Sequence, residues 1–157
     1  MPHRAIGTTL LITVLLAAVG CSGSSSSSSS SSTTAPSQTI ATDVLTGTVP
    51  PPVNGVLQSA SNTFVVGQGG GAVSVTLTSA VETLPGRTLL PTVTMGLAVG
   101  TATITACTPL ANAFTTAQGG STAQLSGNLA AGTYCVLVSD VTNQVGPVAY
   151  AVAVSHP

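Results

Sequence analysis

The sequence predicts an all-β protein whose main domain is an antiparallel β-sandwich. Three observations lead to this prediction. Valine and threonine, which favour strands, are frequent after about residue 40. Several segments there alternate apolar and polar residues, the pattern of a strand with one buried face. Glycine and proline separate these segments at short intervals, and none of them shows the period of an amphipathic helix.

The amino-terminal segment has the composition of an export signal. Arg4 and the amino terminus supply positive charge, and residues 5–19 form an apolar run. This run is too short to cross a hydrocarbon core about 30 Å thick, which needs roughly 20 apolar residues. Small residues stand just before Cys21, as the narrow pocket of a signal peptidase requires. An ordinary cleaved leader, in which Cys21 has no role, and an uncleaved anchor are the alternatives.

The residues around Cys21 resemble the lipobox of bacterial lipoproteins. Val19, Gly20 and Cys21 match that motif, whereas Ala18 stands where leucine is more common. The resemblance implies that residues 1–20 are a signal peptide and that Cys21 carries lipid. Two or three acyl chains hold a protein firmly, because each buried methylene contributes about 0.8 kcal/mol. By the same resemblance, Ser22 implies sorting to the outer membrane of a Gram-negative bacterium.

Residues 21–39 are predicted to be the lipidated cysteine and a flexible tether. An unbroken serine run covers 24–32, and such a segment has no apolar surface to bury. A coil of about 15 residues has a mean span on the order of 20 Å, which is enough to lift a domain clear of lipid headgroups. A glycosylated serine stalk is the alternative interpretation. The three prolines at 50–52 predict a short, stiff polyproline II segment.

The sandwich domain is predicted to span residues 40–157, with a first edge strand starting near Val44. The segments 62–66 and 73–78 are expected to pair as a hairpin around a glycine turn at 68–71. Gly100 is expected to form a turn or a bulge between the segments 93–99 and 101–106. The predicted strands after the edge strand cover 62–66, 73–78, 93–99, 101–106, 123–129, 134–138 and 148–154.

Residues 125–154 resemble the closing half of the bacterial pre-peptidase C-terminal domain. The motif Ala131-Gly132-Thr133-Tyr134 and the last strand at 150–154 match that family, and 64–77 resembles its opening. The resemblance covers most of 62–155 and implies a sandwich of the jelly-roll type. The family usually carries an aspartate near the middle, whereas 92–106 is apolar and threonine-rich, which puts the calcium site of some relatives in doubt. Such domains usually accompany a secreted protease, and no protease domain is present in this sequence.

Cys107 and Cys135 are predicted to form a disulfide bond. They are the only cysteines besides Cys21, and an exported protein meets an oxidising compartment. If Tyr134 and Val136 face inward, Cys135 faces outward, so the bridge is expected to join adjacent strands on the outer face of a sheet. Two free buried thiols are the alternative. A metal-binding pair is not favoured, because there is no CxxC motif and no nearby histidine.

The predicted mature chain has very few charges. Its charged side chains are Asp43, Glu82, Arg87 and Asp140, and the sequence contains no lysine. This composition argues against a nucleic-acid footprint and against a polybasic membrane patch. Each acid is expected to lie in a turn, where a carboxylate caps backbone amides.

A catalytic device is not predicted, and neither is a cofactor or a metal. The only candidate base is His156, one residue from the end of the sequence, where fraying is expected. Ser139 and Asp140 are the residues that would have to join it, and no Gly-x-Ser-x-Gly turn is present.

The sequence therefore predicts a non-enzymatic envelope lipoprotein, anchored through Cys21, that displays an adhesion or accessory module for an envelope protein or polysaccharide. The first alternative is a carbohydrate-binding module, and a hydrolase is less favoured. Sugar platforms usually stack on exposed aromatic rings. Phe114 is the candidate ring, since the other three aromatic residues are expected to face inward. A cap over the core is the other interpretation of Phe114, and it is the favoured one.

Overall fold

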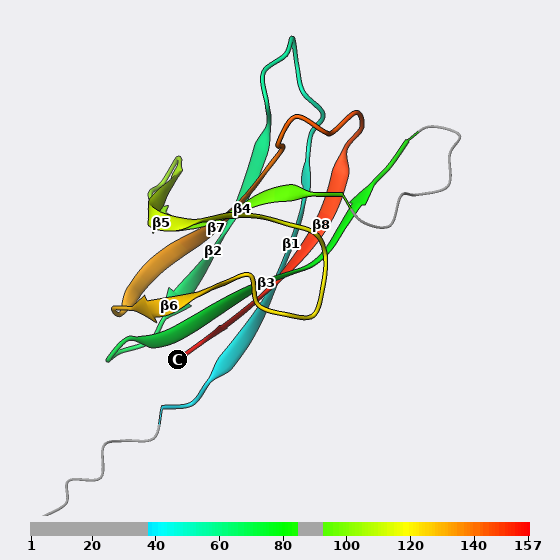
Figure 1. Ribbon diagram of the computed structural model, residues 1–157. Helices are drawn as coiled ribbons and strands as arrows, with labels where there is room; N and C mark the ends of the chain where they lie inside the picture. The colour runs from blue at the N-terminus through cyan, green and yellow to red at the C-terminus, as the bar shows by residue number, and fades with distance from the viewer. Residues whose placement is uncertain (1–37, 85–92) are drawn as a thin grey trace, which may run out of the picture. The chain divides into compact units, whose positions relative to one another are not determined.

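The computed structural model describes residues 38–84 and 93–157. Eight strands in these ranges form two antiparallel sheets of four strands each, which pack face to face (Figure 1). The predicted all-β sandwich is therefore confirmed. The predicted signal peptide, Cys21 and nearly all of the tether lie outside the described residues. Within the described ranges, no helix is long and apolar enough to span a membrane.

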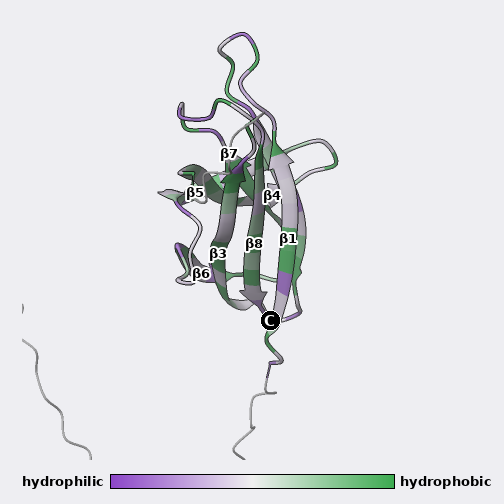
Figure 2. Cartoon of the chain, turned by 90° about the vertical axis from the view of Figure 1, so that its right-hand side faces the viewer, coloured by the Kyte–Doolittle hydropathy of each residue, from purple (hydrophilic) through white to green (hydrophobic). Residues whose placement is uncertain are grey.

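The first sheet has the strand order β1-β8-β3-β6. Figure 2 shows β3, β8 and β1 side by side, with β6 at the far edge. The bounds of these strands are β1 (Ala41–Val49), β8 (Val148–His156), β3 (Gly71–Glu82) and β6 (Leu125–Leu129).

The second sheet has the strand order β2-β7-β4-β5. Every connection except β4–β5 passes from one sheet to the other, and the two strand orders together are those of a jelly roll. The bounds of these strands are β2 (Ser59–Val66), β7 (Gly132–Ser139), β4 (Met95–Ala102) and β5 (Cys107–Ala117).

The predicted hairpin between 62–66 and 73–78 is wrong, because β2 and β3 belong to different sheets. The glycine segment between them carries the chain across the sandwich instead of reversing it within one sheet. Gly70 has φ 66°, and a Cβ there would collide with the Leu129 carbonyl oxygen. The glycine segment was therefore correctly predicted to be a tight connection. The alternation of apolar and polar residues alone does not show which strands pair.

The predicted strand at 101–106 is also wrong. β4 continues through Gly100 to Ala102, and the chain then turns, with Thr103 N donating a 2.9 Å hydrogen bond to the Ala106 carbonyl. Gly100 is neither a turn nor the bulged residue, because it pairs regularly with Cys135 of β7, and the extra residues of the irregular β4–β5 ladder lie on β5. β5 itself was not predicted.

The core lies between the sheets and is built from the inward-facing residues of the alternating strands. Its largest fully buried side chains are Leu77 of β3 with Met95 and Leu97 of β4. Phe64 and Tyr150 are buried and Tyr134 packs against the core, as the alternation predicted. Residues Pro36–Pro157 form one compact unit that contains both sheets and this core. We therefore expect this segment to fold independently.

The two lateral edges of the sandwich differ. At the β1–β2 edge, Asn62 Nδ2 donates to the Thr46 carbonyl, and the Tyr150 hydroxyl donates a 2.6 Å hydrogen bond to Asn62 Oδ1. These bonds tie the two sheets together. At the opposite edge, β5 and β6 are the last strands of their sheets.

The buried Tyr150 makes the fold sensitive to alkaline pH. Burial raises the pKa of Tyr150 above its ordinary value of 10.0. The unfolded chain then ionises first, so the free energy of unfolding is expected to fall as the pH rises from about 9 to about 11. Urea unfolding across this range should show a smaller fall in Tyr150→Phe than in the wild type. An equal fall in both proteins would contradict the assignment, and Tyr134→Phe, which keeps Tyr150, is the matched control.

Candidate functional site

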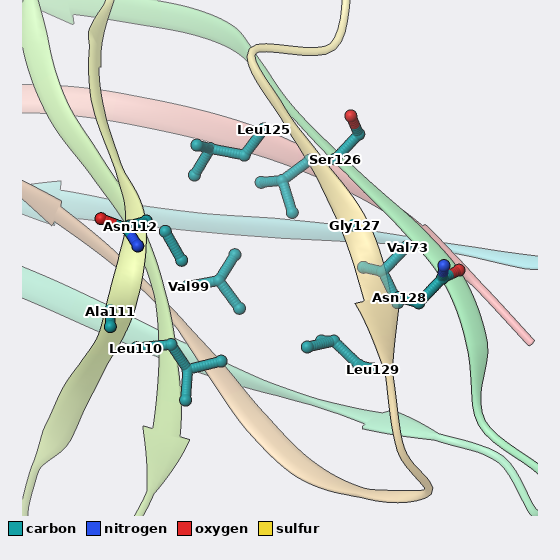
Figure 3. Close-up of a pocket in the computed structure, with 12 residues that line it drawn as sticks. Val73, Val99, Leu110, Ala111, Asn112, Leu125, Ser126, Gly127, Asn128 and Leu129 are labelled. Atoms are coloured by element: carbon teal, nitrogen blue, oxygen red, sulfur yellow. The ribbon is translucent and has the colours of Figure 1, made fainter. Parts of the chain in front are cut away.

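The candidate site is a cleft between the edge strands β5 and β6, with a volume of about 310 Å³. Its floor is made by Val73 and Val75 of β3 and by Val99 of β4, all of them buried. Figure 3 shows Leu110 of β5 and Leu129 of β6 directed toward each other across this space. The cleft is thus an opening into the apolar interior at one edge of the sandwich.

A large bulge in β5 forms one wall. Between the pairs Ala98–Phe114 and Gly100–Pro109, the chain advances two positions along β4 but five along β5. Residues 110–113 therefore leave the regular ladder, and all of them line the cleft. Asn112 takes a left-handed backbone conformation, with φ 60°, which asparagine tolerates better than most residues do.

The wall on β6 has a gap in its middle. Leu125, Gly127 and Leu129 lie opposite Val75, Val73 and Gly71 of β3, so these three residues face inward. The two leucines pack against the core. A Cβ on Gly127 would have no atom within 4 Å. The missing side chain between two leucines therefore helps to keep the cleft open.

The residues that line the cleft carry no charge. They are valine, leucine, alanine and glycine, with Asn112, Ser126 and Asn128 as the polar members. Ser126 and Asn128 alternate with the inward residues of β6 and are exposed, so their side chains face away from the cleft. Small-molecule sites typically have volumes of about 300–1,000 Å³ and mostly apolar walls with few polar groups. The cleft suits an uncharged, apolar group.

The predicted disulfide joins Cys107 and Cys135, whose Cα atoms are 5.8 Å apart. The expectation of adjacent strands is wrong, because Cys107 is on β5, Cys135 is on β7, and β4 lies between them. Gly100 of β4 allows this arrangement, since the Cys107 sulfur lies 3.0 Å from where a Gly100 Cβ would be. Cys135 and Leu137 lie on the opposite side of β7 from the core residue Val136. The bridge therefore passes over Gly100 on the outer face of the sheet.

Phe114 is 57 % exposed and is not a cap over the core. Its ring lies on the outer face of the second sheet, with Cε2 3.2 Å from where a Cβ of Gly96 would be. It does not line the cleft. The interpretation of Phe114 as an exposed ring fits this position.

His156 is not frayed. It lies in β8 opposite Ala41 of β1, is 6 % exposed and packs beside the Phe64 ring at a centroid distance of 5.7 Å. Its Nε2 lies 3.1 Å from Asp43 Oδ2, and its Nδ1 lies 3.1 Å from the Pro157 carbonyl oxygen. The strand ladder overrides the tendency of a terminal segment to fray. Neither Ser139 nor Asp140 is a hydrogen-bond partner of His156 in the described part of the chain.

The other described acids hold the loop between β7 and β8. Asp140 lies in this loop, as predicted, and its Oδ1 accepts bonds from the backbone N–H groups of Asn143 and Gln144. Glu82 ends β3, and Asp43 lies within β1, so the prediction of turn positions is wrong for both. Arg87 lies outside the described residues. In residues 38–84 and 93–157, no group of three or more histidine, cysteine, aspartate or glutamate residues could hold a metal ion.

The cleft was not predicted from the sequence. Its lining comes from β3, β4, β5 and β6, and its opening depends on a bulge and a glycine, neither of which has a distinctive pattern. No protein-family model, no curated protein and no solved structure matches this chain.

Proposed function

We propose that this protein is a non-enzymatic lipoprotein of the cell envelope. A lipid on Cys21 anchors it to a membrane, with the outer membrane of a Gram-negative bacterium implied by Ser22. The serine-rich tether carries a jelly-roll domain that binds its ligand or partner in the envelope. This proposal has two separate supports, the lipobox-like residues 18–21 and the geometry of the described domain.

The β5–β6 cleft is the observation that carries the binding role. It combines apolar walls with a volume suited to a small ligand or a side group of a larger one. The ionisable side chains described above, by contrast, make contacts within the fold. Glu82 and Asp140 hold a loop and Asp43 pairs with His156, so these groups act as structural elements and not as an acid–base pair.

The anchor is tested by following the fate of Cys21 in a bacterial host that processes lipoproteins. The wild-type chain is expected to fractionate with membranes and to yield an amino-terminal peptide that begins at Cys21 and carries diacylglyceryl and acyl mass. Cys21→Ser should lose the lipid mass and the labelling by radioactive fatty acid. An unmodified Cys21 on a protein that is soluble without detergent would refute the anchor. Separation of the two membranes on a density gradient tests the outer-membrane assignment.

Carbohydrate binding through Phe114 is a second candidate, and the exposure of its ring is the observation in its favour. A glycan array probed with the wild type and with Phe114→Ala separates the candidates. Reproducible sugar binding that disappears in Phe114→Ala would favour the carbohydrate-binding module.

A further inference from the structure

We propose that the β5–β6 cleft binds a straight aliphatic chain, such as the acyl chain of a fatty acid or lipid, and that Gly127 leaves the room for it. This inference rests on the proposed binding function and names its ligand class. It does not depend on the lipid at Cys21. The cleft follows β6 from Leu125 to Leu129, a rise of about 13 Å at roughly 3.3 Å per strand residue.

The lining selects against other kinds of occupant. A peptide strand needs a regular row of backbone partners, whereas β5 is interrupted by its bulge and β6 has only five residues. Much of such a peptide would lie against aliphatic walls with its N–H and C=O groups unpaired, which is costly. Sugars usually require an aromatic face, and none of the lining residues is aromatic. A charged group would find no counter-ion on these walls. A hydrocarbon chain has no polar groups to satisfy, and Asn112 is exposed and is the one polar lining residue on β5, near which the polar end of the chain would lie.

Gly127 is the residue on which the proposal depends most. Its φ lies outside the left-handed region, and a Cβ there meets no atom within 4 Å, so the fold does not require glycine at this position. Glycine usually weakens a strand, because it gains no packing and loses more backbone entropy on folding. A glycine that the backbone does not need, between two inward leucines, keeps the cavity open.

The test uses residues 36–157, which lack Cys21 and its lipid, after co-purified lipid has been extracted. The fold of this segment is checked by circular dichroism and thermal unfolding. Dansyl-undecanoic acid is the fluorescent probe, in detergent-free buffer, and straight-chain fatty acids of increasing length are the competitors. We expect saturable binding at one site. Each added methylene of the competitor should lower its Kd about fourfold, equivalent to about 0.8 kcal/mol, until the cleft is filled.

Two substitutions to leucine, on the inner and the outer face of the first sheet, make the matched comparison. Gly127→Leu adds its side chain inside the cleft and should raise the Kd of the probe about tenfold or more, without lowering the Tm. Ala72→Leu adds bulk to the exposed outer face of β3, outside the cleft lining, and should bind as the wild type does. If Gly127→Leu does not fold, Ala113→Leu narrows the cleft from the β5 side and should weaken binding in the same direction.

The outcomes separate this inference from the anchor. Absence of saturable binding by the wild type would overturn it, and so would equal binding by the wild type, Gly127→Leu and Ala113→Leu. Displacement of the probe by a strand-forming peptide or a sugar as readily as by fatty acids would overturn the ligand class. An unmodified Cys21 with intact, Gly127-dependent binding would refute the anchor alone, and a lipidated Cys21 without binding would refute the cleft alone.

Discussion

Replacement of both Cys107 and Cys135 by alanine is expected to lower the free energy of unfolding by about 3–4 kcal/mol. The bridge closes a loop with a sequence separation of 28 residues, and a loop of that size restricts the unfolded chain by about this amount in the chain-entropy model. In the folded state, β7 pairs with β4 and not with β5. The bond therefore adds a direct link from the start of β5 to β7, across Gly100.

Urea unfolding of the 36–157 segment measures this effect. The reduced wild type should unfold at the same urea concentration as the double variant, and reductant should leave the double variant unchanged. Alkylation of both thiols in the unreduced native protein would show that the bond is not formed. A double variant as stable as the oxidised wild type would show that the bridge contributes no net stability.

Truncation of Glu82 to alanine is expected to cost about 3 kcal/mol or more, because hydrogen bonds to a charged group contribute about 1.5–3 kcal/mol each. The side chain is 4 % exposed, and its Oε1 accepts the backbone N–H groups of Val145 and Gly146 at 2.6 and 2.7 Å. Removing the carboxylate leaves the buried Gly146 N–H without its acceptor. The loop between β7 and β8 then loses two of its hydrogen bonds to the end of β3 and keeps the bond from Thr83 N to the Pro147 carbonyl.

Glu82→Gln is the matched control, since its amide oxygen can accept the same two bonds at nearly the same place. Its expected cost is smaller, about 1 kcal/mol, in the range of a single hydrogen bond. Hydrogen exchange at the amides of Val145 and Gly146 reports on the loop directly and should accelerate in Glu82→Ala. Slow exchange and unchanged stability in Glu82→Ala would mean that this carboxylate does not hold the loop.

The sequence predicted strands where large apolar residues recur at every second position. Val73, Val75 and Leu77 of β3 alternate with serine and threonine, and the valines of β8 alternate mostly with alanine, so period and burial agree. β5 has no such pattern, because its bulge shifts the side chains between the faces at 110–113. Alternation predicts a strand only where the ladder is regular.

Pairing and the cleft depend on contacts between residues far apart in the chain. β3 pairs with β6 and β8, although the glycine turn before it suggested pairing with β2. The position of His156 near the end of the sequence suggested fraying. Its pairing with Ala41 holds it in the sheet, and this contact could not be predicted because Ala41 is more than a hundred residues away. Gly127 lies within the predicted strand at 123–129, and only its place opposite Val73 shows that it faces the cleft.

The bulged edge of β5 also bears on how copies of this domain behave when crowded. A free edge invites another chain to extend the sheet, and proline or irregular backbone discourages such growth. β5 carries Pro109, which lacks an N–H group, and a left-handed Asn112 that interrupts the row of donors and acceptors. β6, the edge strand of the other sheet on this side, has only five residues. On this side of the sandwich, neighbouring molecules therefore lack a long, regular strand along which they could extend either sheet.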